Sequence, residues 1–94
     1  MREKPIEQDL VQAVRRVGGL APKFISPGWA GVPDRLVLLP GGRVAFVEVK
    51  APGKTLRPLQ ERRKGQLEAL GFRVYVIDRP EQILEILHEG GDAQ

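Results

Sequence analysis

The first segment of the chain carries apolar residues at helical spacing. They are Ile6, Leu10, Ala13, Val14 and Val17. This pattern predicts a helix from Pro5 to Val17, which the glycine pair at positions 18 and 19 ends. Glu7 shares or borders the apolar face of this helix, because it lies one turn before Leu10 and two turns before Val14. A carboxylate in this position lies either at the rim of the core or inside a polar site.

The middle of the chain has the pattern of strands. Two runs, Asp34 to Leu39 and Arg43 to Lys50, are joined across Pro40-Gly41-Gly42. Apolar residues occupy both faces of these runs, as expected of central strands that are covered on two sides. Ahead of them, Leu20 to Ile25 predicts a short edge strand, since Pro22 marks the segment as peripheral.

Helical and extended segments alternate again in the second half. A helix is predicted from Thr55 or Leu56 to Leu70, with Thr55 as its cap and Pro58 in its first turn. The run from 72 to 77 is rich in residues that favour strands.

A last helix is expected after Asp78 and Glu81, which have the spacing of a capping box. Its buried stripe would consist of Ile83, Leu84 and Leu87. The tail from 90 to 94 is expected to be frayed. The predicted order is therefore α-β-β-β-α-β-α, an α/β fold with a mixed central sheet flanked by helices, in a single domain over 1–94.

The turn between the two central strands makes a specific prediction about register. If Pro40, Gly41 and Gly42 form a three-residue loop, Leu39 pairs with Arg43, and counting back places Asp34 opposite Glu48 on the same face. Opposed Cβ atoms lie about 4.5 to 5.5 Å apart, so the two carboxylates would repel each other unless a cation or a proton lay between them. A two-residue loop would put them on opposite faces. Lys50, two positions after Glu48, projects from the same face as Glu48.

Composition limits the chemistry that the chain can support. With 94 residues, of which 41% are hydrophobic, it can build one small core, and a partner subunit would add stability. The absence of cysteine excludes disulfides, thiolate metal sites and a thiol nucleophile, so a bound metal must use oxygen ligands or the single histidine, His88. The sequence has no run that predicts a membrane span and no signal-peptide pattern, so we expect a cytoplasmic protein.

Basic residues concentrate in one part of the chain, although the net charge is only +3. Between positions 50 and 64 six basic residues stand against one acidic residue, Glu61; those expected to contact DNA are Lys54, Arg57, Arg62, Arg63 and Lys64. Such a segment suits a polyanion, because lysine and arginine that neutralise phosphates release counterions. Charge alone is equally compatible with a solvated helix face. For Trp29, the single tryptophan, we expect a core or dimer contact rather than base stacking.

The acidic pair predicts a site for a hard divalent cation. Mg²⁺ prefers oxygen ligands, usually one or two carboxylates together with water and substrate phosphate. Asp34 and Glu48 meet this requirement, and the backbone carbonyl of Val49 could add a ligand. Lys50 could orient or deprotonate an attacking water, or stabilise the transition state. Glu7 could hold a metal-bound water or part of a second metal site.

Several of these residues together carry a family resemblance. Gly31-Val-Pro-Asp34, then Glu48-Val-Lys50, then Gln60 early in a helix, with Glu7 in the first helix, resemble the VRR-NUC family of virus-type replication-repair nucleases. That family belongs to the PD-(D/E)XK nuclease superfamily, whose fold is restriction-endonuclease-like. The resemblance extends from about Ile6 to Leu87 and so covers nearly the whole chain.

The resemblance implies a role for each of these positions. Asp34 and Glu48 would be metal ligands, Lys50 the catalytic lysine, and Glu7 an assisting residue, while Gln60 would support the site or contact the substrate. It also implies a Mg²⁺- or Mn²⁺-dependent endonuclease for branched DNA such as four-way junctions. Stand-alone members of the family, which are encoded by phages and bacteria, imply a homodimer that works in a bacterial or phage-infected cell.

A phosphate-binding loop is one alternative, because Gly53-Lys54-Thr55 follows a strand and precedes a helix. The Walker A motif also needs a glycine five positions before Gly53, and that position is Glu48. A carboxylate there would repel a nucleotide, so no nucleotide cofactor is expected.

Two further alternatives stay open. In a non-catalytic nucleic-acid binder the basic helix would hold phosphates and the acidic pair would be incidental. Removal of metal would abolish cleavage by an enzyme and leave such a binder unaffected. A structural or partner-binding domain would lack the steep salt dependence of nucleic-acid affinity.

Overall fold

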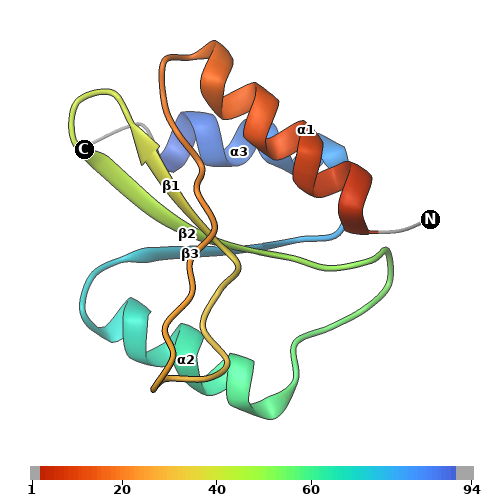
Figure 1. The fold of residues 1–94 in the computed structure, drawn as a ribbon, viewed down its shortest axis with the longest axis vertical. Helices are drawn as coiled ribbons and strands as arrows, with labels where there is room; N and C mark the ends of the chain where they lie inside the picture. Colours follow the sequence, from red (N-terminus) through yellow and green to blue (C-terminus); the bar gives the residue numbers. More distant parts are fainter. Residues whose placement is uncertain (1–2, 91–94) are drawn as a thin grey trace.

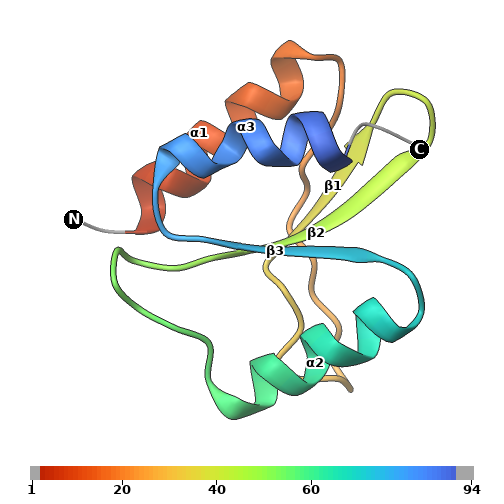
Figure 2. The same ribbon diagram turned by 180° about the vertical axis from the view of Figure 1, so that it is seen from behind.

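A mixed sheet stands at the centre of the molecule, with helices on both of its faces (Figures 1 and 2). The structure is a computed structural model, and it describes residues 3–90. Within these residues the elements are α1 Glu3–Arg16, β1 Arg35–Leu39, β2 Arg43–Val49, α2 Pro58–Ala69, β3 Arg73–Ile77, η1 Pro80–Gln82, α3 Ile83–Glu85 and η2 Ile86–Gly90. The three strands lie in the order β1-β2-β3. β1 and β2 are antiparallel, whereas β3 runs parallel to β2 after the crossover through α2.

The two faces of the sheet are covered by different helices: in Figure 1, α1 and α3 lie above the strands and α2 lies below them. α1 and the last helical segment pack on one face, where Ile6, Leu10 and Val14 of α1 are fully buried. α2 covers the other face, over a smaller cluster of Phe46, Leu67 and Val74. Successive residues of β2 point to opposite faces, so Val47 and Val49 face the larger cluster while Phe46 and Glu48 face α2. The α/β class and the mixed sheet flanked by helices are thus confirmed.

The turn between β1 and β2 has the predicted length and register. Leu39 pairs with Arg43, and the pairing continues back to Arg35 opposite Val47. Gly41 and Gly42 have φ values of 87° and 77°, in the left-handed region that favours glycine. The turn residues therefore determine which side chains of the hairpin share a face.

The predicted strand from Leu20 to Ile25 is not regular, and the observed order has three strands within residues 3–90, not four. The segment lies beside β1 through isolated bridges, with Leu20 against Leu38 and Lys23 against Arg35. Pro22 accepts a hydrogen bond from the N–H of Leu36 through its carbonyl (3.0 Å) but has no N–H to return. The missing donor interrupts the ladder, although the segment is peripheral as expected.

The start of α2 also differs from the prediction. The helix begins at Pro58 with Arg57 as its N-cap, so Thr55 is not the cap. The side chain of Gln60 accepts a hydrogen bond from the backbone N–H of Arg57 (2.9 Å). The buried Gln60, inside α2, thus contributes the capping hydrogen bond that was expected to come from Thr55 before the helix.

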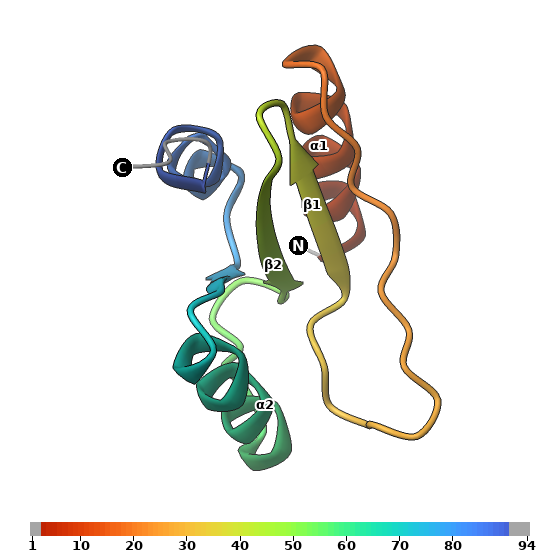
Figure 3. The ribbon, with the colours of Figure 1, turned by 90° about the vertical axis from the view of Figure 1, so that its left-hand side faces the viewer.

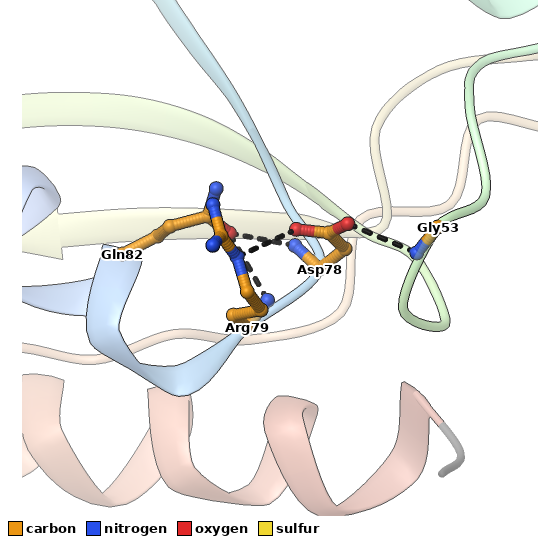
Figure 4. A network of polar contacts seen from close by, with 4 residues as sticks. All are labelled: Gly53, Asp78, Arg79 and Gln82. Atoms are coloured by element: carbon orange, nitrogen blue, oxygen red, sulfur yellow. Dashed lines mark hydrogen bonds and ion pairs between the residues drawn. The ribbon is translucent and has the colours of Figure 1, made fainter.

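The last helix is divided into short segments and is capped by another residue than predicted. Gln82, not Glu81, accepts the backbone N–H groups of Asp78 (2.7 Å) and Arg79 (3.0 Å), as Figure 4 shows. Leu84 was expected to be buried, yet it is 62% exposed, and Ile86 is buried in its place. The 3-10 start of the helix sets its rotation. Residues 91–94 of the expected frayed tail lie outside the described residues.

No helix between residues 3 and 90 combines the length and the apolar content that a membrane span requires. The longest, α1, has 14 residues and buries only one side, through Ile6, Leu10 and Val14.

Candidate active site

Asp34 and Glu48 come together where β1 begins and β2 ends. The pairing of Arg35 with Val47, continued by one step, places Asp34 opposite Glu48 on the face that α2 covers. The negative charge of Asp34 is felt at Glu48, where it raises the pKa. The structure therefore brings together the two carboxylates that the sequence singled out.

Glu48 is a buried carboxylate with an incomplete set of partners. Its side chain is 5% exposed. One oxygen, Oε2, accepts a hydrogen bond from Nε2 of Gln60 (3.1 Å) and lies 3.4 Å from Nζ of Lys50. The other oxygen, Oε1, is buried and has no hydrogen-bond partner in the described part of the chain. Buried carboxylate oxygens are normally paired with a donor or a cation. Oε1 is thus available to a cation.

The pKa values of both carboxyls are raised. Burial is the largest cause at Glu48, followed by the charge of Asp34, and Lys50 opposes them. Burial also comes first at Asp34, where the charges of Glu7 and Glu3 add to it, while the backbone N–H of Val49 and the charge of Lys50 lower the pKa. Each group would ionise more readily beside a further positive charge. The site is thus built to hold more negative charge than its own cations neutralise.

Gln60 supports Glu48 from α2. Its side chain is buried and uses both ends, because Oε1 accepts the N–H of Arg57 and Nε2 donates to Glu48. The backbone at the start of α2 thereby fixes the orientation of the Gln60 amide, and this amide in turn fixes the position of Oε2 of Glu48. Gln60 was expected either to support the site or to contact the substrate, and its hydrogen bond to Glu48 is direct evidence for the supporting role.

Glu7 lies beside Asp34 but is already paired. Its Oε2 accepts a hydrogen bond from Nε of Arg35 (2.9 Å), and Arg35 also donates to the carbonyl of Ala21 (2.7 Å). Glu7 and Asp34 line one cleft of about 230 Å³. Even so, residues 3–90 contain no group of three acidic or histidine side chains close enough to hold a metal ion together. The expected role of Glu7 in a metal site is therefore supported by its position near Asp34, but the two residues are not part of a group of three ligands within residues 3–90.

The backbone near Val49 suits an additional oxygen ligand. The ladder between β1 and β2 ends at Arg35 opposite Val47, so Val49 lies beyond its last pair. Proline has no N–H, so Pro33 cannot occupy the carbonyl of Val49 as a ladder partner. The two carboxylates, one with an unpaired oxygen, and this carbonyl form a donor set that fits a hard cation such as Mg²⁺.

The basic residues of the loop and α2 differ in what they already contact. Lys54 is exposed on the loop after β2, and Arg57 and Arg62 are exposed on and before α2. Lys64 forms an ion pair with Glu68 at 2.9 Å on the surface of the helix. Arg63 differs from all of these, because its guanidinium donates to the carbonyl of Ala30 (2.7 Å).

Two supporting contacts were not predicted from the sequence. The loop after Lys50 is fastened to the end of β3, where Oδ2 of Asp78 accepts the N–H of Gly53 (3.1 Å; Figure 4). In the loop before Asp34, Trp29 packs against the smaller apolar cluster with Arg63 over its ring at 5.1 Å. Asp78 was predicted only as part of a helix cap, and Trp29 as a core or dimer contact, of which its packing on the smaller apolar cluster confirms the core alternative. Neither pattern identified the partner of the residue.

This hairpin with opposed carboxylates, followed by a lysine and a helical glutamine, has the arrangement expected of a nuclease-type site on an α/β fold. A solved structure described as "VRR_NUC domain" matches the chain with a TM-score of 0.84 and 29% identity, over 92% of this chain and 94% of that one. The chain belongs to the VRR-NUC family.

A protein of known sequence agrees with this assignment. It is "Putative nuclease p44" of Acyrthosiphon pisum secondary endosymbiont phage 1, which is 55% identical over 78 residues, or 83% of this chain and 84% of its own length. A scan against models of protein families gave no match.

Proposed function

We propose that this protein is a metal-dependent endonuclease that hydrolyses DNA phosphodiester bonds through an activated water, without a covalent intermediate. The observation that carries the proposal is Glu48, a buried carboxylate opposite Asp34 with one oxygen unpaired beside Lys50. In a purely structural role the two ionised carboxylates would not stabilise the fold, because burial and mutual repulsion disfavour their charged forms and raise their pKa values. The family and the name of the phage relative add independent support.

Asp34, Glu48 and the carbonyl of Val49 would hold Mg²⁺ or Mn²⁺. When bound, such an ion supplies charge neutralisation and a more acidic water. Gln60 keeps Glu48 in one orientation through its hydrogen bond to Oε2. Lys50, 3.4 Å from Glu48, presents a cation on the same face, where it can orient the attacking water and neutralise charge on the phosphate.

The substrate proposed is branched DNA, and the working form is a homodimer. One copy measures 33 × 32 × 23 Å and carries one site, so two symmetric cuts require a second copy. The exposed basic residues Lys54, Arg57 and Arg62 would contact the phosphates. Labelled junction, flap, nicked and linear substrates, together with light scattering, test the substrate and the assembly.

Substitution of the site tests the activity itself. Asp34→Asn, Glu48→Gln and Lys50→Ala should each lower the cleavage rate by about 10²-fold or more in Mg²⁺, since each removes charge from the reacting centre. Glu85→Gln, which removes an exposed carboxylate on α3, is the matched control and should cleave as wild type.

The outcome also separates the enzyme from a simple nucleic-acid binder. If wild type binds DNA yet cleaves none of these substrates with Mg²⁺ or Mn²⁺, the chain is a binder and the proposal is wrong. Normal cleavage by all three folded site variants would show that the site lies elsewhere.

A further inference from the structure

The segment that leads into Asp34 crosses from one layer of the molecule to the other. After α1 it passes beside β1 and reaches α2 before it turns back into β1, as Figures 1 and 3 show. Its far end, residues 26–33, has no strand or helix of its own. Just before this stretch the N–H of Phe24 donates to the carbonyl of Asp34 (2.7 Å), and the stretch itself is held by contacts with α2.

Arg63 of α2 makes two of the contacts between this helix and the loop. Nε of Arg63 donates to the carbonyl of Ala30 (2.7 Å), and its guanidinium lies 5.1 Å from the centroid of the Trp29 ring. A second guanidinium nitrogen donates to the side chain of Gln66 one turn later (3.0 Å), which keeps Arg63 on this side of the helix. The planar fork of arginine suits such simultaneous contacts, whereas lysine is a point charge.

A close approach of the loop backbone to a side chain of α2 adjoins this contact. Gly31 has a φ of 87°, and a Cβ there would lie 2.7 Å from Cγ of Leu59 on α2. Only glycine accepts both the conformation and the approach. The loop thus lies directly against the first turn of α2, three residues before Asp34.

α2 itself depends on polar contacts for its placement. Only two of its 12 residues are buried, Gln60 and Leu67. Gln60 holds Glu48, and Arg63, one turn later on the same helix, holds the loop that carries Asp34. One short helix therefore contacts the segments of both carboxylates.

We propose that Arg63 is a positioning residue that holds the Trp29 loop, residues 26–33, against α2 and so sets Asp34 opposite Glu48. This assigns Arg63 a role other than the DNA contact expected from its place in the basic segment. The inference rests on the proposed function, because its consequence is measured as metal affinity of the Asp34 and Glu48 site.

Arg63→Lys is the informative variant, because it keeps the charge that a phosphate contact would need and removes the planar fork. Trp29 is the single tryptophan, so its fluorescence reports the loop directly. We expect emission at longer wavelength and stronger quenching by acrylamide. Mg²⁺ affinity, followed by calorimetry, should fall about tenfold, at the lower end of the effect of residues that support metal ligands.

DNA affinity and a matched control complete the test. In EDTA, Arg63→Lys should bind DNA within about twofold of wild type with an unchanged salt slope, because its charge is retained. Arg62→Lys makes the same exchange at an exposed neighbour and should leave Trp29 emission and Mg²⁺ affinity unchanged. Trp29→Phe, which keeps a ring beneath Arg63, provides a second variant with a smaller loss of Mg²⁺ affinity should Arg63→Lys fail to fold.

Each result decides the question. Equal Mg²⁺ affinity in wild type and Arg63→Lys would overturn the positioning role, even if the variant were less stable. If wild type bound Mg²⁺ no better than Asp34→Asn, the proposed function would fail first, and the positioning role with it. Wild-type binding that weakens in Arg63→Lys but not in Arg62→Lys supports both.

Discussion

The two faces of the sheet are built in different ways. On the α1 face the interior is apolar, and residues such as Leu10, Val47 and Ile86 are completely excluded from solvent. On the α2 face only Phe46, Leu67 and Val74 form a buried apolar cluster, and two polar side chains lie buried beside them. The comparison shows that stability and chemistry are divided between the faces. A closed core on one side allows the other to hold a pair of carboxylates at a cost in stability.

The largest effect on stability should come from the α1 face. Leu10→Ala removes a fully buried side chain from the main core, and such substitutions lower the free energy of unfolding by about 2 to 5 kcal/mol. Urea denaturation measures this loss. Below its unfolding temperature the variant should keep the wild-type affinity for Mg²⁺; a parallel loss of metal affinity in the folded variant would show that the two faces are not independent.

A smaller effect, confined to the other face, should follow from Gln60→Ala. The variant loses the donor to Glu48 and the acceptor for the N–H of Arg57. Mg²⁺ affinity should fall about 10- to 100-fold, as is typical when a group that orients a metal ligand is removed. Calorimetry with Gln12→Ala as the control, which removes an exposed glutamine on α1, tests this. A purely structural Gln60 would change the melting temperature and leave the metal affinity as it was.

The pH dependence of stability gives the most subtle comparison. Because the folded pKa of Glu48 is raised above its unfolded value, protonation favours the folded state. This contribution is fully present below the unfolded pKa and is lost as pH rises through the folded pKa. Without metal, stability should therefore increase as pH falls from neutrality toward that range, and Glu48→Gln should be more stable than wild type at pH 7.

Thermal melts from pH 7 to 4 measure this, with Glu85→Gln as a control for the change in net charge. Saturating Mg²⁺ should reverse the order of wild type and Glu48→Gln at pH 7, because the ion binds the ionised carboxylate. A Glu48→Gln variant that is less stable than wild type without metal would contradict the predicted penalty.

The arrangement of the carboxylates could be predicted because local residues determine it. The turn at 40–42 sets the hairpin register, and this register brings the backbone of Asp34 to the level of Glu48. Alternation along β2 likewise puts Lys50 beside Glu48. The order of the main elements followed from periodicity for the same reason.

Features that depend on distant partners could not be predicted. Arg63 belongs by sequence to a basic segment, but its contacts are with a loop more than 30 residues earlier in the chain. Similarly, capping by Gln60 and Gln82 depends on how each helix meets the sheet, so Thr55 and Glu81 were the wrong choices. A side chain that reaches across the fold leaves no periodic signal.

The hairpin has a further consequence for how the protein folds. β1 and β2 are adjacent in sequence, so the pairing that unites Asp34 with Glu48 closes one of the shortest loops in the sheet. The parallel pairing of β2 with β3 closes a longer stretch of chain that includes α2, so it carries a greater loop-closure entropy. The two carboxylates therefore belong to the most local contact of the sheet, whereas Gln60 and Arg63 reach them only through the crossover. The chain can bring the two carboxylates together before it assembles the helix that contacts the segments of both.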